Sequence, residues 1–216
     1  MSLDKPLTWE QVTHIVDTYQ LDKLGRSPEE LSRYRTFKKS LNAQNIGITT
    51  NLLKNVLHWI PPETDIHLSD PDAVNLVKYD DARPFANPND VKITLNDFPY
   101  FIANKTDHFV VWIKFPMPPD PNSEIGDIDE KTKGLIEKYI QLTFVQREGI
   151  KREHIIWWKN YTIIQSIKSI PHVHVLVNLD DDVDGSKESN LRKLIGTPGV
   201  MFDYAETTNS SLQTKL

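Results

Sequence analysis

The sequence predicts a single α+β domain in which helices cover one face of an antiparallel β-sheet and N-terminal helices pack alongside. Capped amphipathic helices occupy the first quarter of the chain, and four segments after residue 90 alternate apolar and polar residues as half-buried strands do. No internal repeat indicates a second domain. We expect the domain to span residues 1–204, with a helical part at 8–59, a sheet-containing part at 74–178 and a flexible tail at 205–216.

Composition narrows the class of protein. The chain has 216 residues, of which 38% are hydrophobic and 25% charged, as in an ordinary globular domain. The absence of cysteine excludes disulfides, thiolate metal sites and a cysteine nucleophile. A net charge of -5 argues against a nucleic-acid partner, because such partners require a basic surface. No apolar run has the length of a signal peptide or membrane span, so we expect a cytoplasmic protein without a membrane partner.

Two helices are predicted from their N-terminal caps. Thr8 is followed three residues later by Gln11, and Ser27 by Glu30, which is the capping-box spacing. The second helix carries an apolar stripe of Leu31, Tyr34, Phe37 and Leu41. A third helix is expected at 51–59, followed by an irregular, proline-rich connection at 61–89 with a short strand at 74–78.

Four segments read as strands. These are "VKITLN" from Val91, "HFVVWIKF" from His108, "HIIWWKN" from His154 and "HVHVLVN" from His172. A helix capped by Asp127 with Glu130 and running to about 147 separates the second strand from the third. The polar and aromatic sides of the first two strands offer candidate ligand-binding residues, namely Lys92, Asn96, His108, Trp112 and Lys114.

The last strand places two histidines on one face. His172 and His174 alternate with Val173, Val175 and Val177, so the valines are predicted to be buried while the imidazoles face a pocket. Three interpretations are open for an isolated pair of this kind. The imidazoles are merely tolerated at the surface, or they bind a metal with a third ligand such as His108 or Asp97, or they act on phosphate groups.

Two charged stretches have simple interpretations. Basic residues around the second helix, Arg26, Arg33, Arg35, Lys38 and Lys39, form a solvated face unless the helix reaches the histidines, where arginine would favour phosphate. Asp180, Asp182, Asp184 and Gly185 match half of an EF-hand loop, but position twelve is Leu191 in place of the bidentate glutamate. We therefore expect no calcium site there.

Four ordered motifs resemble a fungal family, the N-acetylglucosamine-induced proteins, which is catalogued as a domain of unknown function. The motifs are "LGRSPEELSRYRTF", "NDFPYF", "HFVVWIKFPMPPDP" and "WWKNYTIIQSIKSIPHVHVLV", and the likeness runs from the first helix to Asn178. This resemblance implies a link to amino-sugar response but no reaction.

A more distant resemblance is to the histidine-triad superfamily, which includes the galactose-phosphate uridylyltransferases. "SIPHVHVLV" is similar to the superfamily motif, which implies a histidine-triad-like fold with His174 as the nucleophile and His172 as the first histidine. The same resemblance places Ser169 and Asn160 at phosphate- or ribose-binding positions. Leu176 stands where the third histidine would be, as in the uridylyltransferase branch, which also has two.

These observations lead to three functional hypotheses. The first is hydrolysis or transfer at a nucleotide or sugar-nucleotide phosphoanhydride, with His174 attacking, His172 assisting and Ser169, Lys92 or Lys114 stabilising charge. The second is a non-catalytic protein that senses an amino-sugar or nucleotide metabolite, and the third is a metal-binding protein. We expect a small phosphate, nucleotide or amino-sugar ligand, no cofactor and no resident metal.

Overall fold

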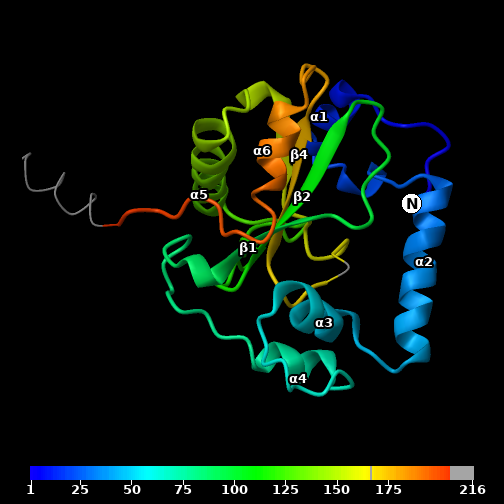
Figure 1. The fold of residues 1–216 in the computed structure, drawn as a ribbon, viewed down its shortest axis with the longest axis vertical. Coiled ribbons are helices and arrows are strands. Elements are labelled where there is room, and N and C mark those ends of the chain that lie inside the picture. Colours follow the sequence, from blue (N-terminus) through cyan, green and yellow to red (C-terminus); the bar gives the residue numbers. More distant parts are fainter. Residues whose placement is uncertain (166, 205–216) are drawn as a thin grey trace, which may run out of the picture.

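The computed structural model describes residues 1–165 and 167–204, so the tail predicted at 205–216 lies outside the described residues. Its centre is a four-stranded sheet in the order β1-β2-β4-β3, in which every neighbouring pair is antiparallel (Figure 1). The strands are β1 (Val91–Leu95), β2 (Thr106–Ile113), β3 (Ile155–Trp158) and β4 (His172–Asn178). All four were predicted, and the α+β single-domain class is confirmed.

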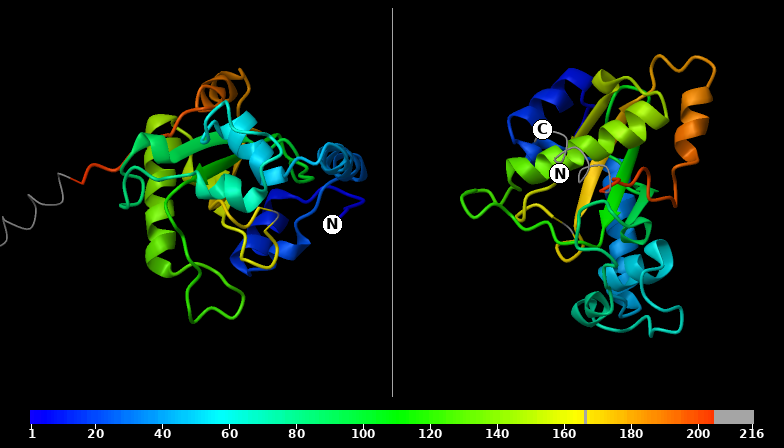
Figure 2. Two further views of the ribbon diagram at one scale, coloured as in Figure 1. Left: turned by 90° about the horizontal axis from the view of Figure 1, so that it is seen from below. Right: turned by 90° about the vertical axis from the view of Figure 1, so that its left-hand side faces the viewer.

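Helices lie on both faces of this sheet (Figure 2). The helices are α1 (Trp9–Asp17), α2 (Pro28–Ala43), α3 (Ile48–Asn51), α4 (Asp70–Asn75), α5 (Glu130–Ile140) and α6 (Ser186–Arg192), and α4 packs against α3. Wider π-type turns at Leu52–Leu57 and Gln141–Arg147 prolong α3 and α5 without a break. Among the described residues, none of these helices is long and apolar enough to cross a bilayer.

The main hydrophobic core lies between one sheet face and helices α5 and α6. Val173, Val175 and Val177 are at most 1% exposed and belong to this core, which confirms their predicted burial. Tyr139 of α5 and Leu191 of α6 cover them from the helix side. Alternation along the strands therefore turns the histidines of β4 to the opposite face.

The opposite face is covered by helices as well, where the sequence predicted covering helices on one face only. One apolar cluster joins Leu53 and Leu57, in the turn after α3, to Val110 and Trp112 of β2. A second cluster joins α1 and the following segment to Ile156, Trp158 and Leu176. Burying the apolar side chains of these two clusters away from water is favourable, which explains why helices cover this face too. Between the two clusters lies a polar strip of the sheet that contains His172 and His174 of β4.

Three local expectations require correction. Asp129 rather than Asp127 caps α5, because its carboxylate accepts from Thr132 N at 2.7 Å. The strand expected at 74–78 is wrong, since Ser69 as N-cap with proline in the first turn starts helix α4 there instead. The helix expected at 51–59 begins earlier, at Ile48, and ends at Leu57.

Candidate functional site

Strand register brings three histidines together on the face away from the main core. His174 pairs with Val110 of β2 and Trp158 of β3, while His172 pairs with Trp112. The ring centroids of His174 lie 5.2 Å from those of His108 and 5.4 Å from those of His172. The third imidazole is thus His108 of β2, since β4 has Leu176 at the next position on this face.

A cavity of about 1030 Å³, which we call the histidine pocket, opens over this cluster. Its floor is the sheet, where His172 and His174 lie beside Trp112 of the first apolar cluster and Lys92 lies beyond it on β1. Residues from the start of α2, the turn after α3 and the loop after β1 form its walls, among them Arg26, Tyr34, Val56, Asn96, Phe98 and Tyr100. Pockets for small organic ligands typically have volumes of about 300–1,000 Å³, so a nucleotide or sugar nucleotide would fit.

A buried hydrogen-bond chain fixes the protonation of His174. The indole Nε1 of Trp158 donates to Asn160 Oδ1 at 3.1 Å, and because an indole is only a donor, this bond orients the amide. Asn160 Nδ2 therefore donates to His174 Nε2 at 3.2 Å. His174 must then carry its proton on Nδ1 and donate to His108 Nε2 at 3.0 Å. Both ring nitrogens of His174 are engaged inside the protein.

This arrangement of hydrogen bonds disfavours a further proton on either His174 or His108. A proton on His174 Nε2 would face the amide donor of Asn160, and one on His108 Nε2 would face the N–H of His174. Burial, which disfavours charge, lowers the pKa of His108 to about 3, and burial together with the neighbouring imidazoles and Arg26 lowers that of His174 well below its usual range. The pair is neutral at physiological pH.

His172 differs from the pair in having one unoccupied ring nitrogen. Its Nδ1 donates to the carbonyl oxygen of Ile170 at 2.8 Å, and its ring packs on Trp112 with centroids 4.7 Å apart. Burial lowers its pKa to about 4, so Nε2 carries a lone pair. Among the described residues Nε2 has no hydrogen-bond partner. It is also not a fully buried atom, because the only fully buried side-chain nitrogen or oxygen without a partner in this part of the chain is Asp107 Oδ2. The bare nitrogen is therefore accessible from the pocket.

Arg26 provides a cation with free donors in the same pocket. Its guanidinium carbon lies 4.9 Å from the ring centroid of Tyr34 and 5.3 Å from that of Tyr100, and its Nε donates to Phe98 O at 2.8 Å. Within the described residues no carboxylate lies within 4.0 Å of Arg26, and its two terminal nitrogens make no hydrogen bond. The two rings and the carbonyl hold the side chain in place while the terminal nitrogens stay available.

Lys92 adds a second positive group. Its Nζ donates to the carbonyl oxygen of Leu57 at 2.8 Å, and burial lowers its pKa. The carboxylates that line the pocket, Asp22 and Asp97, are both exposed. The pocket therefore combines cations and neutral imidazoles with negative groups only at exposed positions, which favours an anionic ligand.

The other candidates divide between the pocket and its surroundings. Asn96 lines the pocket, and its Nδ2 lies 3.4 Å from both ring nitrogens of His108, which is buried and does not itself line the pocket. Ser169 is exposed and does not line the pocket. Lys114 lies outside it too, with its Nζ 3.9 Å from Asp90 and over the ring of Trp59. The structure thus separates these last two from the histidines.

Sequence reasoning missed the aromatic wall that holds Arg26. The sequence pattern places Tyr34 in an apolar helix stripe, yet the residue is only half-buried and its ring lies 5.1 Å from that of Phe98, centroid to centroid. Tyr100 stacks on His108 at 5.3 Å. The available signal was the aromatic spacing in "NDFPYF", in a loop that follows a strand.

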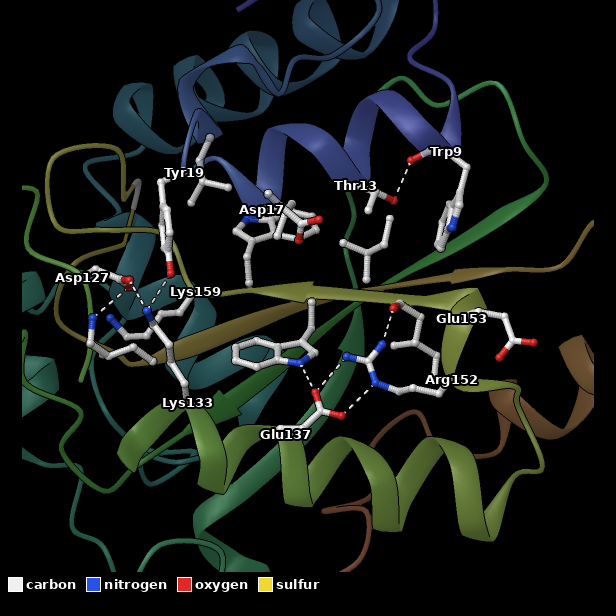
Figure 3. A pocket seen from close by; sticks show the side chains of 17 residues that line it. Trp9, Thr13, Asp17, Tyr19, Asp127, Lys133, Glu137, Arg152, Glu153 and Lys159 are labelled. Atoms are coloured by element: carbon white, nitrogen blue, oxygen red, sulfur yellow. Dashed lines mark hydrogen bonds and ion pairs between the residues drawn. The ribbon is translucent and has the colours of Figure 1, made fainter. Parts of the chain in front are cut away.

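A second cavity, of about 740 Å³, runs along the free edge of β3 between α1 and α5, and we call it the β3 groove (Figure 3). Its charged groups are largely paired with each other. Glu137 accepts from Arg152 at 2.8 Å and from the indole of Trp157 at 2.7 Å. Lys133 binds Asp127 at 2.9 Å and the hydroxyl of Tyr19. These four charged side chains of the β3 groove are therefore already engaged with partners inside the protein.

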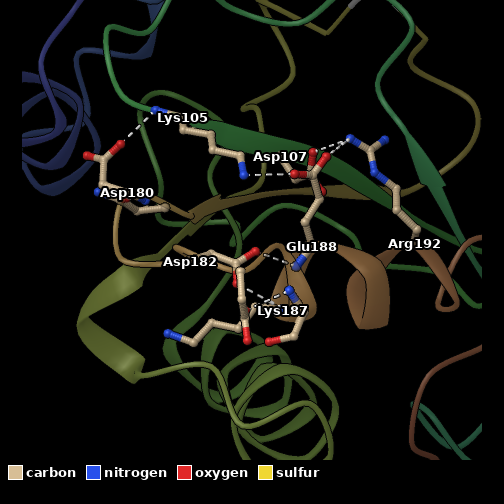
Figure 4. Close-up of polar contacts among 10 residues, drawn as sticks. Lys105, Asp107, Asp180, Asp182, Lys187, Glu188 and Arg192 are labelled. Atoms are coloured by element: carbon tan, nitrogen blue, oxygen red, sulfur yellow. Dashed lines mark hydrogen bonds and ion pairs between the residues drawn. The ribbon is translucent and has the colours of Figure 1, made fainter.

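The acidic loop after β4 has a structural role (Figure 4). Asp182 is 7% exposed, and its two oxygens accept from the backbone N–H groups of Lys187 and Glu188 at 3.1 and 2.9 Å. It thereby stabilises the start of α6, a helix that the sequence did not predict. Within the described residues no group of three or more histidine, aspartate or glutamate side chains is arranged to hold a metal ion.

Comparisons with known proteins identify a solved structure of similar fold and a family of related sequences. The crystal structure of a protein called HTC1 superposes with a TM-score of 0.67 at 22% identity, covering 89% of this chain and 98% of that one. N-acetylglucosamine-induced protein 1 of Candida albicans is 36% identical over 181 residues, which are 82% of this chain and 70% of the relative. An uncharacterized protein of Saccharomyces cerevisiae is 25% identical over 169 residues, or 78% of this chain and 77% of that protein. Residues 8–178 match the family described as protein of unknown function DUF3605, and the chain belongs to that family.

Proposed function

We propose that the histidine pocket binds a small anionic sugar derivative, either a phosphorylated amino sugar or a sugar nucleotide. The observation that carries this proposal is Arg26, a half-buried guanidinium with free terminal nitrogens and no carboxylate partner among the described residues. Arginine presents two parallel donors that match phosphate oxygens. The name of the Candida albicans relative, which refers to N-acetylglucosamine, supports an amino sugar as the organic part.

The remaining pocket residues suit the uncharged part of such a ligand. Neutral imidazole and amide groups at His172, Asn96 and Asn160 exchange hydrogen bonds with hydroxyl or acetamido groups without adding charge. The rings of Trp112 and Tyr100 offer flat surfaces on which a sugar or base can pack. The pocket thus has a positively charged part at Arg26, which suits a phosphate group, and an uncharged part, which suits the sugar.

Hydrolysis or transfer at a phosphoanhydride is a second candidate function. It is favoured by the neutral imidazole of His172, whose bare nitrogen faces the same pocket as Arg26. A neutral imidazole can attack phosphorus, while an arginine can stabilise the charge of the transferring group. Binding alone defines a sensor, and consumption of the bound ligand defines an enzyme.

A thermal-shift panel tests both candidates. We expect N-acetylglucosamine 6-phosphate or a UDP-linked sugar to raise the melting temperature, because a ligand that binds only the native state adds about 2.7 kcal/mol at a concentration of 100 Kd. Neutral N-acetylglucosamine is the matched control and should shift it far less. Equal shifts for the neutral and phosphorylated sugars would contradict an anion-binding pocket. Product analysis of the same mixtures separates the enzyme from the sensor.

A further inference from the structure

We infer that His172, through Nε2, is the reactive imidazole of the pocket, and that His174 is a positioning residue held neutral by Asn160 and His108. This inverts the roles implied by the resemblance to histidine-triad enzymes, in which His174 would attack. As far as a bound ligand is concerned, the inference rests on the proposed function. The order of reactivity among the three imidazoles, by contrast, depends only on the hydrogen bonds of the free protein.

The first step concerns His174. Its Nε2 accepts from Asn160 at 3.2 Å and its Nδ1 donates to His108 at 3.0 Å, with Trp158 fixing the orientation of the Asn160 amide. An attacking nitrogen needs a lone pair that points at the substrate. The lone pair of His174 is instead directed at the amide of Asn160, so attack would first require that buried bond to break.

The second step concerns His172. The carbonyl oxygen of Ile170 can only accept, so the bond of 2.8 Å keeps the proton on Nδ1 and leaves the lone pair on Nε2. Packing against Trp112 restricts the plane of the ring. The result is an oriented neutral imidazole whose unprotonated nitrogen is accessible from the pocket that contains Arg26.

The same geometry supports a balanced chemical step for a phosphoanhydride ligand. Nε2 of His172 donates its lone pair to phosphorus and forms a P–N bond, while the P–O bond to the leaving group breaks and the leaving oxygen keeps the electron pair. The ring then carries a positive charge, which the Nδ1–H bond to the Ile170 carbonyl stabilises. Water attacks phosphorus, the P–N bond breaks and returns its electron pair to Nε2, and the proton of water passes to solvent.

Labelling of the ligand-free protein with a limiting amount of diethyl pyrocarbonate, read by peptide mass spectrometry, tests this order. The reagent acylates imidazole nitrogens that carry a lone pair. We expect His172 to be labelled at least about tenfold faster than His174 and His108, since one hydrogen bond in a buried site is worth about 1.4 kcal/mol or more. With the pKa of His172 at about 4, its labelling rate should remain nearly constant from pH 8 to pH 5.5, whereas an ordinary imidazole with a pKa near 6.5 loses most of its rate there.

Two outcomes would overturn the inference. One is labelling of His174 as fast as that of His172, and the other is an unlabelled His172 after further reagent has labelled the exposed His14 completely. The variant Asn160→Ala removes the bond to His174 Nε2 and should make His174 reactive. Continued protection of His174 in that variant would show that Asn160 is not the blocking group.

A ligand arm separates this inference from the proposed function. N-acetylglucosamine 6-phosphate that raises the melting temperature should also slow labelling of His172 at least about fivefold, because Nε2 then lies against the ligand. Stabilisation without protection of His172 would overturn the assigned contact and leave the binding proposal intact. A panel in which no phosphorylated sugar stabilises the protein would overturn the binding proposal, while the labelling order of the free protein would still decide which imidazole is reactive.

Discussion

Replacing Arg26 by glutamine is expected to weaken binding of a phosphorylated sugar by about ten- to a hundredfold. Hydrogen bonds to charged groups contribute about 1.5–3 kcal/mol, and each 1.4 kcal/mol is a factor of ten in affinity. Arg26→Lys keeps the charge but loses the two parallel donors, so its loss of affinity should be intermediate. Titration calorimetry with N-acetylglucosamine 6-phosphate measures the three affinities.

Arg35→Gln is the matched control for this experiment. Arg35 is an exposed residue of α2 and does not line the histidine pocket, so its replacement removes the same charge without removing a pocket donor. It should bind the ligand with nearly wild-type affinity. If Arg26→Gln and Arg35→Gln lose the same affinity, the effect is one of net charge, and Arg26 is not the phosphate ligand.

Acidification from pH 7.5 to pH 5 is expected to lower the free energy of unfolding by about 2 kcal/mol for each of His172 and His108. The pKa is about 4 for His172 and about 3 for His108 in the folded protein, against about 6.5 when unfolded. Between those values the unfolded state binds more protons, so stability is full above about pH 6.5 and falls as the pH drops toward 4. Urea unfolding at a series of pH values measures this slope.

The variant His172→Gln shows how much of this pH dependence of the free energy of unfolding comes from His172. It removes one imidazole that must charge on unfolding, so the loss of stability between pH 7.5 and 5 should shrink by about 2 kcal/mol relative to wild type. His14→Gln, an exposed change on α1, is the matched control and should not reduce the loss in this way. A wild-type slope in His172→Gln would contradict a neutral, buried His172.

The strands and their faces could be predicted because alternation is a local property. Every second residue of "HVHVLVN" enters the main core, and the register then sets His172 beside Trp112 and His174 beside Trp158. Helix α6 could not be predicted, since the carboxylate of Asp182 that stabilises its start precedes the helix by several residues and read as part of a solvated loop.

The site was predicted in outline but not in its chemistry. His172 and His174 were placed in a pocket, and arginine near α2 was expected to matter if it reached them, which Arg26 does. The roles of the two histidines depend on contacts far apart in the sequence, such as the bond between His108 and His174, 66 residues away. Single-sequence patterns contain no such information, so the motif alone could not show that both ring nitrogens of His174 are hydrogen-bonded while Nε2 of His172 is not.

The most direct measurement of the central proposal is a crystal structure of the protein with N-acetylglucosamine 6-phosphate bound. We expect the phosphate oxygens within hydrogen-bond distance of the terminal nitrogens of Arg26, and the ligand over Trp112 with a polar atom near Nε2 of His172. A ligand bound in the β3 groove between α1 and α5, with the histidine pocket containing only solvent, would contradict the proposal.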